Sequence, residues 1–242
     1  SDGVREITLL CQNVNNYRGR TKTGMELGLG GLIKELSNIN GLERVRYTTS
    51  YPADMSDELI DAHRDVEILM PFLHLPMQSG SNKILSSMNR RHTVEDYLTL
   101  VEKLREARPE IALSSDFIVG FPGETEKDFE STMQVVEKLN FAQAYSFKYS
   151  KRPGTPAAKF NSQVPEALKI ERLSILQKLL NSKQLKFNQS WIGKSLPVLL
   201  DRVGRHDGQL LGRSPFLQSV HSFLPVELLG KIIDLNINSD QQ

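Results

Sequence analysis

The stretch SSDFIVGFPGETEKDF, at 114–129, carries the residues whose types and spacing most clearly suggest a ligand site. Its apolar run at 117–119 is typical of a buried strand, and Gly120 and Gly123 supply a tight turn after it. Acidic residues follow at once, as they do at a helix N-terminus. A turn between a strand and a helix lies where α/β folds bind ligands. The same pattern also fits a plain strand-to-helix turn, because glycine-rich turns are a weak signal alone.

Polar or glycine-bearing loops follow every predicted strand, and this favours the ligand-binding interpretation. Five strands alternate with helices along residues 6–149, which predicts an α/β fold with a parallel sheet and right-handed crossovers. The loops after the strands would then gather at the carboxyl edge of the sheet, where ligand sites form. Their sequences are QNVNNY, TSYP, PMQSGS, GFPGET and YSKRPGT.

The elements that position these loops are predicted from hydrophobic periodicity and from capping residues. Strands are expected at 6–11, 44–48, 71–75, 111–119 and 142–149. Helices are expected at about 24–37, 82–88, 93–107, 124–139 and 166–188. Ser56 is expected to cap a further helix, and Thr93 with Asp96 resembles a capping box.

After Trp191 the composition changes to short strand-like runs separated by Gly and Pro. The chain is therefore expected to divide into residues 1–189 and a small all-β domain at 190–242. Small β barrels often bind nucleic acid, although many do not. Five basic and five acidic residues cancel in this domain, so its net charge neither favours nor excludes nucleic-acid binding. Its arginines either share an RNA-binding face or simply face solvent.

The overall composition limits which classes of protein this chain can belong to. The chain has 242 residues, a net charge of +1 and a single cysteine, Cys11. No apolar run of about 18 residues and no signal peptide are present, so we expect no membrane contact and a cytoplasmic location. One cysteine excludes a disulfide framework within the chain, and such a residue is expected to be a small buried hydrophobe.

Several stretches closely resemble, in order and spacing, the radical S-adenosylmethionine methylthiotransferases. They are LLCQNVNNY, YTTSYP, HLPMQSGSNKILSSMNRRHT, DFIVGFPGETEKDFE and FKYSKRPGTPAA. The resemblance runs from residue 3 to about residue 237. It implies a partial (β/α) barrel lacking its first strand, followed by a small RNA-binding β barrel like the TRAM domain. Within the family these motif sequences are most similar to those of the branch that methylthiolates isopentenyladenosine next to the tRNA anticodon. The alternatives are the ribosomal-protein branch and a cluster-free RNA-binding module.

The resemblance implies S-adenosylmethionine as cofactor and suggests residues for it. Arg90 stands where the cofactor carboxylate would be bound, with Arg91 as the adjacent alternative. The backbone at 118–121, including Gly120, is expected to flank the adenine. Asp116 is expected to be a site residue or a buried structural acid. The ribose and amino group are expected to contact Asn13, Ser50, Gln78 and Ser79.

The resemblance also implies a tRNA anticodon stem-loop as partner of a monomeric enzyme. The sequence identifies neither an electron donor nor a sulfur donor. His74 and His92 are expected to be packing residues rather than ligands. The residues expected to contact RNA are Lys194, Arg202, Arg205 and Arg213.

The sequence departs from the family in its cysteines. The family's two 4Fe–4S clusters need a Cys-x-x-x-Cys-x-x-Cys loop after the first barrel strand and three further cysteines, since thiolates hold such clusters. With Cys11 alone, we expect no cluster to be ligated by this chain. We therefore expect it to bind S-adenosylmethionine weakly or not at all and to be inactive by itself. We also expect it to be the C-terminal portion of a longer enzyme, with strand 6–11 at an exposed sheet edge.

Overall fold

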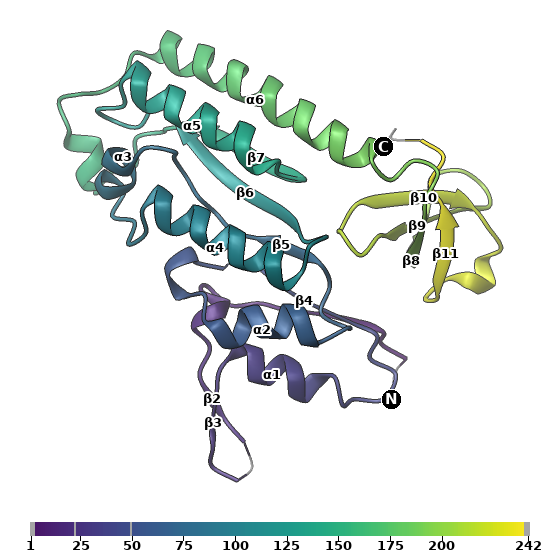
Figure 1. Cartoon of the computed structure of the whole chain (residues 1–242). Coiled ribbons are helices and arrows are strands. Elements are labelled where there is room, and N and C mark those ends of the chain that lie inside the picture. The colour runs from purple at the N-terminus through teal and green to yellow at the C-terminus, as the bar shows by residue number, and fades with distance from the viewer. Residues whose placement is uncertain (1–2, 22, 49, 240–242) are drawn as a thin grey trace.

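A computed structural model describes residues 3–21, 23–48 and 50–239 (Figure 1). An open parallel sheet with helices packed on its outer face forms the larger part. A long helix then leads to a small antiparallel sheet at the other end of the molecule (Figure 1). Among the described helices, none combines the length and the hydrophobicity that crossing a bilayer requires.

The parallel sheet follows the order of the chain. Its strands are β1 (Glu6–Leu9), β4 (Arg44–Tyr47), β5 (Phe72–His74), β6 (Ala112–Val119) and β7 (Gln143–Lys148). β1 pairs with β4 in one group, and β6 lies between β5 and β7 in the other. A parallel bridge from Val45 to Leu69 joins the two groups. The predicted parallel α/β arrangement is confirmed. Within the described residues β1 and β7 do not pair, so the sheet is a part-barrel with these strands at its edges.

The helices lie close to where periodicity and capping predict them. They are α1 (Leu29–Leu36), α2 (Asp57–Asp65), α3 (Asn82–Ser87), α4 (Val94–Ala107), α5 (Glu126–Leu139) and α6 (Glu166–Gln189). Ser56 caps α2 by accepting from Leu59 N, and Thr93 and Asp96 form the expected capping box. Short 3-10 helices occur at Val14–Asn16, Pro52–Asp54, Pro156–Lys159 and Val226–Leu228.

Two helix starts differ from the prediction. A hairpin of β2 (Gly19–Arg20) and β3 (Glu26–Leu27) precedes α1, so the helix expected from residue 24 begins only at residue 29. Gly24 has a φ of +85° in the hairpin turn, a conformation that a helix does not allow. The helix expected from residue 124 begins at residue 126, because Thr125 is its N-cap.

Cys11 also differs from the prediction. It was expected to be a small buried hydrophobe, but it is exposed in the loop after β1. β1 is short and ends at Leu9, so the chain has already left the sheet and its packed face when it reaches the cysteine.

The second sheet is antiparallel and has the strand order β10-β9-β8-β11. Its strands are β8 (Ser195–Val203), β9 (Gln209–Arg213), β10 (Ser219–Phe223) and β11 (Ile232–Asn236). β8 and β9 change register around Asp201, where a bulge places an extra residue on the strand. We call this unit the β domain.

The β domain packs on the amino edge of the part-barrel. Phe72, Ala112 and Ala142, at or just before the starts of three parallel strands, share one apolar cluster with Val198 and Phe216. The cofactor loops predicted from the sequence follow the opposite, carboxyl ends of these strands. The β domain and those loops therefore lie at opposite ends of the barrel (Figure 1).

Two buried arginines of β4 fasten the β domain in place. Arg44 donates to the carbonyl oxygens of Arg213, at 2.9 Å, and Pro197, at 2.5 Å. Arg46 donates to those of Pro215 and Ser214, each at 2.8 Å. Glu6, on the neighbouring strand, lies 3.1 Å from Arg46 Nε and balances its charge. Four charge-assisted hydrogen bonds from two buried guanidinium groups make this a fixed contact rather than a flexible tether.

Candidate cofactor site

A cavity of about 470 Å³ lies at the carboxyl edge of the part-barrel. The loops after β1, β4, β5 and α3 line it. Four residues predicted from the sequence to bind the cofactor are among its lining: Asn13, Ser50, Gln78 and Arg90. They are far apart in the chain and meet because parallel strands end at the same edge of a sheet.

Several polar atoms in the lining are buried and have no hydrogen-bond partner among the described residues. They are Asn13 Oδ1, Ser50 Oγ and Arg90 Nε. Leaving such atoms unpaired costs free energy, so native structures usually provide them with a partner. Two acceptors and a guanidinium donor match a ligand that carries hydroxyl or amino groups and a carboxylate.

Gln78 forms the wall between the cavity and β6. Its backbone has a φ of +76°, a left-handed conformation that is uncommon outside glycine. Hydrogen bonds on both sides hold it there: Gln78 N donates to Asp116 O at 2.8 Å, and Ile118 N donates to Gln78 O at 3.0 Å. Backbone held in a sparsely populated conformation is common at functional sites.

Tyr51 and Asp54 also organise this site, and the sequence did not single them out. Asp54 accepts from Asn13 Nδ2 at 2.5 Å and from Arg91 Nη2 at 2.9 Å. The Tyr51 hydroxyl accepts from Arg91 N at 2.8 Å, and its ring faces the guanidinium of Arg90 at 5.8 Å. The available signal was the stretch TSYPAD, which directly follows a predicted strand.

The structure distinguishes the two neighbouring arginines. Arg91 is exposed and its guanidinium forms an ion pair with Asp54 at 2.9 Å. Arg90 is half-buried, and its Nε has no protein partner among the described residues. Arg90 is therefore the one whose charge is available to a carboxylate in the cavity.

Three predicted cofactor residues lie outside this cavity lining. Ser79 is buried, and its Oγ accepts from Ser81 N at 3.2 Å, in the turn before α3. Asp116 lies on the inner face of β6, with its Oδ2 3.5 Å from His74 Nε2. Gly120 N donates to Glu124 Oε1 at 2.8 Å. The cofactor roles given to these three stay predictions.

The two histidines expected to pack lie beside the site. His74 Nδ1 is 3.0 Å from Ser114 Oγ, so both of its ring nitrogens face polar groups of β6. His92 is buried between the rings of Tyr51, at 5.9 Å, and Tyr97, at 6.1 Å. Burial lowers the pKa of His92.

The glycine corner at 120–123 holds helix α6 against the barrel. Glu124 Oε1 accepts from Arg172 Nη1 at 2.8 Å, and both side chains are buried. Burial raises the pKa of Glu124, opposed by the bonds from Gly120 N and Arg172. A Cβ on Gly120 would lie 2.4 Å from Lys169 Cγ, so only glycine leaves room for α6. The described contacts of this corner are therefore structural.

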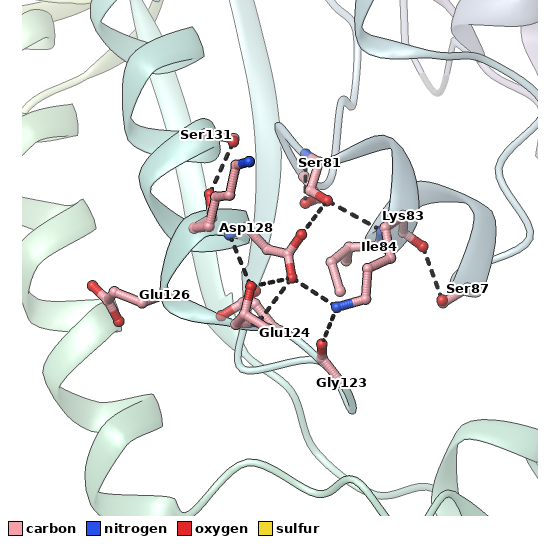
Figure 2. Close-up of polar contacts among 12 residues, drawn as sticks. Ser81, Lys83, Ile84, Ser87, Gly123, Glu124, Glu126, Asp128 and Ser131 are labelled. Atoms are coloured by element: carbon pink, nitrogen blue, oxygen red, sulfur yellow. Dashed lines mark hydrogen bonds and ion pairs between the residues drawn. The ribbon is translucent and has the colours of Figure 1, made fainter.

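A second network, around Asp128, fixes the glycine corner to the start of α3 (Figure 2). Asp128 accepts from Ser81 Oγ at 2.7 Å, from Thr125 Oγ1 at 2.7 Å and from Lys83 Nζ at 3.0 Å. Lys83 also donates to Gly123 O at 2.7 Å. Burial opposes ionisation of Asp128, but these hydrogen bonds prevail and hold its pKa well below the ordinary value.

The residues of this chain do not suit an iron–sulfur cluster. Within the described ranges no three His, Cys, Asp or Glu side chains come together as metal ligands. A cluster needs several thiolates, and the chain has only Cys11.

The comparison with known families agrees with this architecture. The model of the Radical SAM superfamily matches residues 7–136, more than half of the chain. The chain belongs to the radical SAM superfamily. Members of this superfamily use S-adenosylmethionine with a 4Fe–4S cluster.

Curated relatives narrow the likeness within the superfamily. The chain is 56% identical over 237 residues to a protein named tRNA-2-methylthio-N(6)-dimethylallyladenosine synthase from Sphingopyxis alaskensis. It is equally identical to the protein of that name from Agrobacterium fabrum. The matches cover 98% of this chain but 53% and 52% of the relatives, so the chain spans about half of their length. The resemblance to methylthiotransferases is confirmed.

A solved structure shows the same fold at much lower sequence identity. Coproporphyrinogen III oxidase from Escherichia coli, a radical SAM enzyme, matches with a TM-score of 0.52 and 16% identity. The match covers 77% of this chain and 50% of the oxidase. At this identity the likeness concerns the radical SAM fold alone.

Proposed function

We propose that this chain is part of an enzyme that converts N6-dimethylallyladenosine in tRNA to its 2-methylthio derivative. The observation that carries the proposal is the 56% identity to two synthases of this name along nearly the whole chain. The cavity at the carboxyl edge supports it, because its unpartnered polar atoms suit S-adenosylmethionine.

Each cavity residue has a part in holding the cofactor. Arg90 binds the carboxylate, because its Nε has no hydrogen-bond partner among the described residues. Asn13 Oδ1 and Ser50 Oγ accept from the amino group and the ribose hydroxyls. Gln78 fixes the cavity wall. When bound, S-adenosylmethionine supplies the methyl group of the product.

The two 4Fe–4S clusters are held by residues outside this chain, because Cys11 alone cannot form a thiolate site. The chain by itself is therefore inactive and binds S-adenosylmethionine weakly or not at all. A tRNA substrate places the intact enzyme in the cytoplasm, and we propose that it acts as a monomer.

The RNA partner is the anticodon stem-loop, and the β domain supplies part of its binding surface. Arg202 and Arg213 lie on one face, each with its Nε near Asp201, at 3.0 and 3.2 Å. Arg205 is exposed in the β8–β9 turn, and Lys194 packs its ammonium 4.9 Å from the Trp191 ring. A binding surface made of such cations loses affinity as salt rises.

The test is nucleoside mass spectrometry of tRNA from cells that lack the intact protein. We expect the methylthio nucleoside to disappear and N6-dimethylallyladenosine to accumulate, with recovery on re-expression. Unchanged tRNA together with loss of methylthiolation on a ribosomal protein would establish the sister activity instead. Intact protein without iron and sulfide would indicate a cluster-free RNA-binding module.

A further inference from the structure

The position of the β domain poses a problem for an enzyme that acts on one base of an RNA. The domain is fixed to the amino edge of the barrel by Arg44 and Arg46, whereas the cofactor cavity opens at the carboxyl edge. Helix α6 runs between the two ends and has 24 residues, which makes it about 36 Å long. Contacts at the β domain alone do not fix a base at the cavity, so an RNA contact is needed at the carboxyl edge.

The loop after β7, at 149–163, has the charge that such a contact requires. It contains Lys151, Arg152 and Lys159 and not one acidic residue. All three cations are exposed, and none forms an ion pair with any residue that the structure describes. Nearby Lys148 is different, because it already pairs with Glu166.

This loop is anchored at the mouth of the barrel. Gly123 N, in the glycine corner after β6, donates to Ser162 O at 2.8 Å. Gln163 Nε2 closes the loop on itself by donating to Ala157 O at 3.0 Å and to Phe160 O at 2.9 Å. The loop follows β7, so it lies at the carboxyl edge, away from the β domain (Figure 1).

We propose that the loop at 149–163 binds the phosphate backbone of the RNA and holds the target base over the barrel mouth. This rests on the proposed function, which supplies an RNA substrate. Lysine and arginine without internal counter-ions complement phosphates, and such contacts set the register of the RNA without reading its sequence. Phe160, 39% exposed in the same loop, offers a ring on which a base can stack.

The charge environment favours this loop over the β domain as the main phosphate site. Arg202 and Arg213 both share Asp201, whose carboxylate an RNA phosphate would have to displace. Lys151 and Arg152 have no such competitor among the described residues. A phosphate gains more from a cation that is not already neutralised.

The test compares binding of an anticodon stem-loop RNA to the full chain and to its Lys151→Ala/Arg152→Ala variant. The matched control is Lys178→Ala/Lys186→Ala, which removes the same charge from exposed positions of α6. Fluorescence anisotropy over a salt series gives the affinity and its salt slope. For two lost contacts to a single-stranded loop we expect the slope to shrink by about 1.4 and the affinity to fall ~25-fold near 0.1 M salt. The control should stay near wild type.

The outcomes separate this inference from the proposed function. Equal weakening in the loop variant and the α6 control would overturn the inference, because net charge alone would then explain the loss. An unchanged loop variant beside a much weaker Arg202→Ala/Arg213→Ala variant would also overturn it, while leaving an RNA substrate in place. If the unmodified chain bound no RNA, both the inference and the RNA contact assigned to this chain would fall. Circular dichroism of each variant checks that it is folded.

Discussion

Arg172 Nη1 lies 2.8 Å from Glu124 Oε1, with the side chains only 3% and 2% exposed. This ion pair joins the first turns of α6 to the glycine corner after β6. Arg172 Nη2 also reaches Glu126 at 2.9 Å. The long helix that leads to the β domain is thus fixed at the carboxyl edge of the barrel by a buried ion pair.

Replacing Arg172 by alanine should destabilise the chain strongly. Glu124 would remain as a buried carboxylate without its counter-ion, which typically costs about 3–5 kcal/mol of unfolding free energy. Urea denaturation measures the loss. A Glu124→Gln/Arg172→Met double variant should recover part of it, because no unpaired charge is then buried. Equal losses in the single and double variants would contradict the importance of the pair.

Gly120→Ala and Gly154→Ala should differ in their effect on stability. Both glycines have a positive φ, +69° and +85°, so each variant pays about 1–2 kcal/mol for the left-handed conformation. Only at Gly120 does the new Cβ meet a neighbour, Lys169 Cγ at 2.4 Å, and overpacking adds about 1–3 kcal/mol. Thermal and urea unfolding of the two variants give the comparison. Similar losses of stability in the two variants would show that Lys169 or α6 moves aside to make room for the new Cβ.

Asp128→Asn should lower stability at neutral pH by about 1–2 kcal/mol, since charge-assisted hydrogen bonds from Ser81 and Lys83 are weakened. The pKa of Asp128 is depressed in the folded state, so the native protein binds fewer protons than the unfolded chain at acid pH. The stabilisation is therefore complete above the ordinary pKa of 3.8 and is lost as pH falls towards the folded pKa. The gap between wild type and variant should narrow as pH falls from about 5 to 2.

Asp96→Asn is the matched control for this prediction. Asp96 and Asp128 occupy the same position of two capping boxes, with Thr93 and Thr125 as N-caps. Among the described contacts Asp128 adds bonds to a second helix and Asp96 does not, so the Asp128 variant should lose clearly more stability at neutral pH. An equal loss in the two variants would reduce the role of Asp128 to helix capping.

Arg90→Ala should weaken binding of S-adenosylmethionine more than Arg91→Ala. A lost charge-assisted hydrogen bond costs about 1.5–3 kcal/mol, or roughly 10- to 150-fold in affinity. Arg91 is already paired with Asp54, so its loss should have a smaller effect on the cofactor. Saturation-transfer NMR at millimolar cofactor suits the weak binding expected of this chain. A greater loss in Arg91→Ala would assign the carboxylate to that residue.

The local elements of this protein follow from its sequence. Ser56 and the Thr93–Asp96 capping box act within three residues of themselves, so their roles are legible in the sequence. Strand and helix periodicity likewise gives the parallel α/β order. The resemblance of five stretches to methylthiotransferases is also a property of the sequence, and relatives at 56% identity bear it out.

Only the tertiary structure decided which distant residues meet. Asn13 and Asp54 are 41 positions apart, and their hydrogen bond depends on how β1 and β4 end side by side. The local pattern at 120–124 predicts a ligand site, which stays a prediction, but it gave no sign that α6 packs there and pairs Arg172 with the buried Glu124. The β domain is held at the amino edge because Arg44 and Arg46 donate hydrogen bonds to its carbonyl oxygens there. Contacts of this kind depend on strand register and domain docking, which involve many residues at once and leave no periodic signal in any one segment.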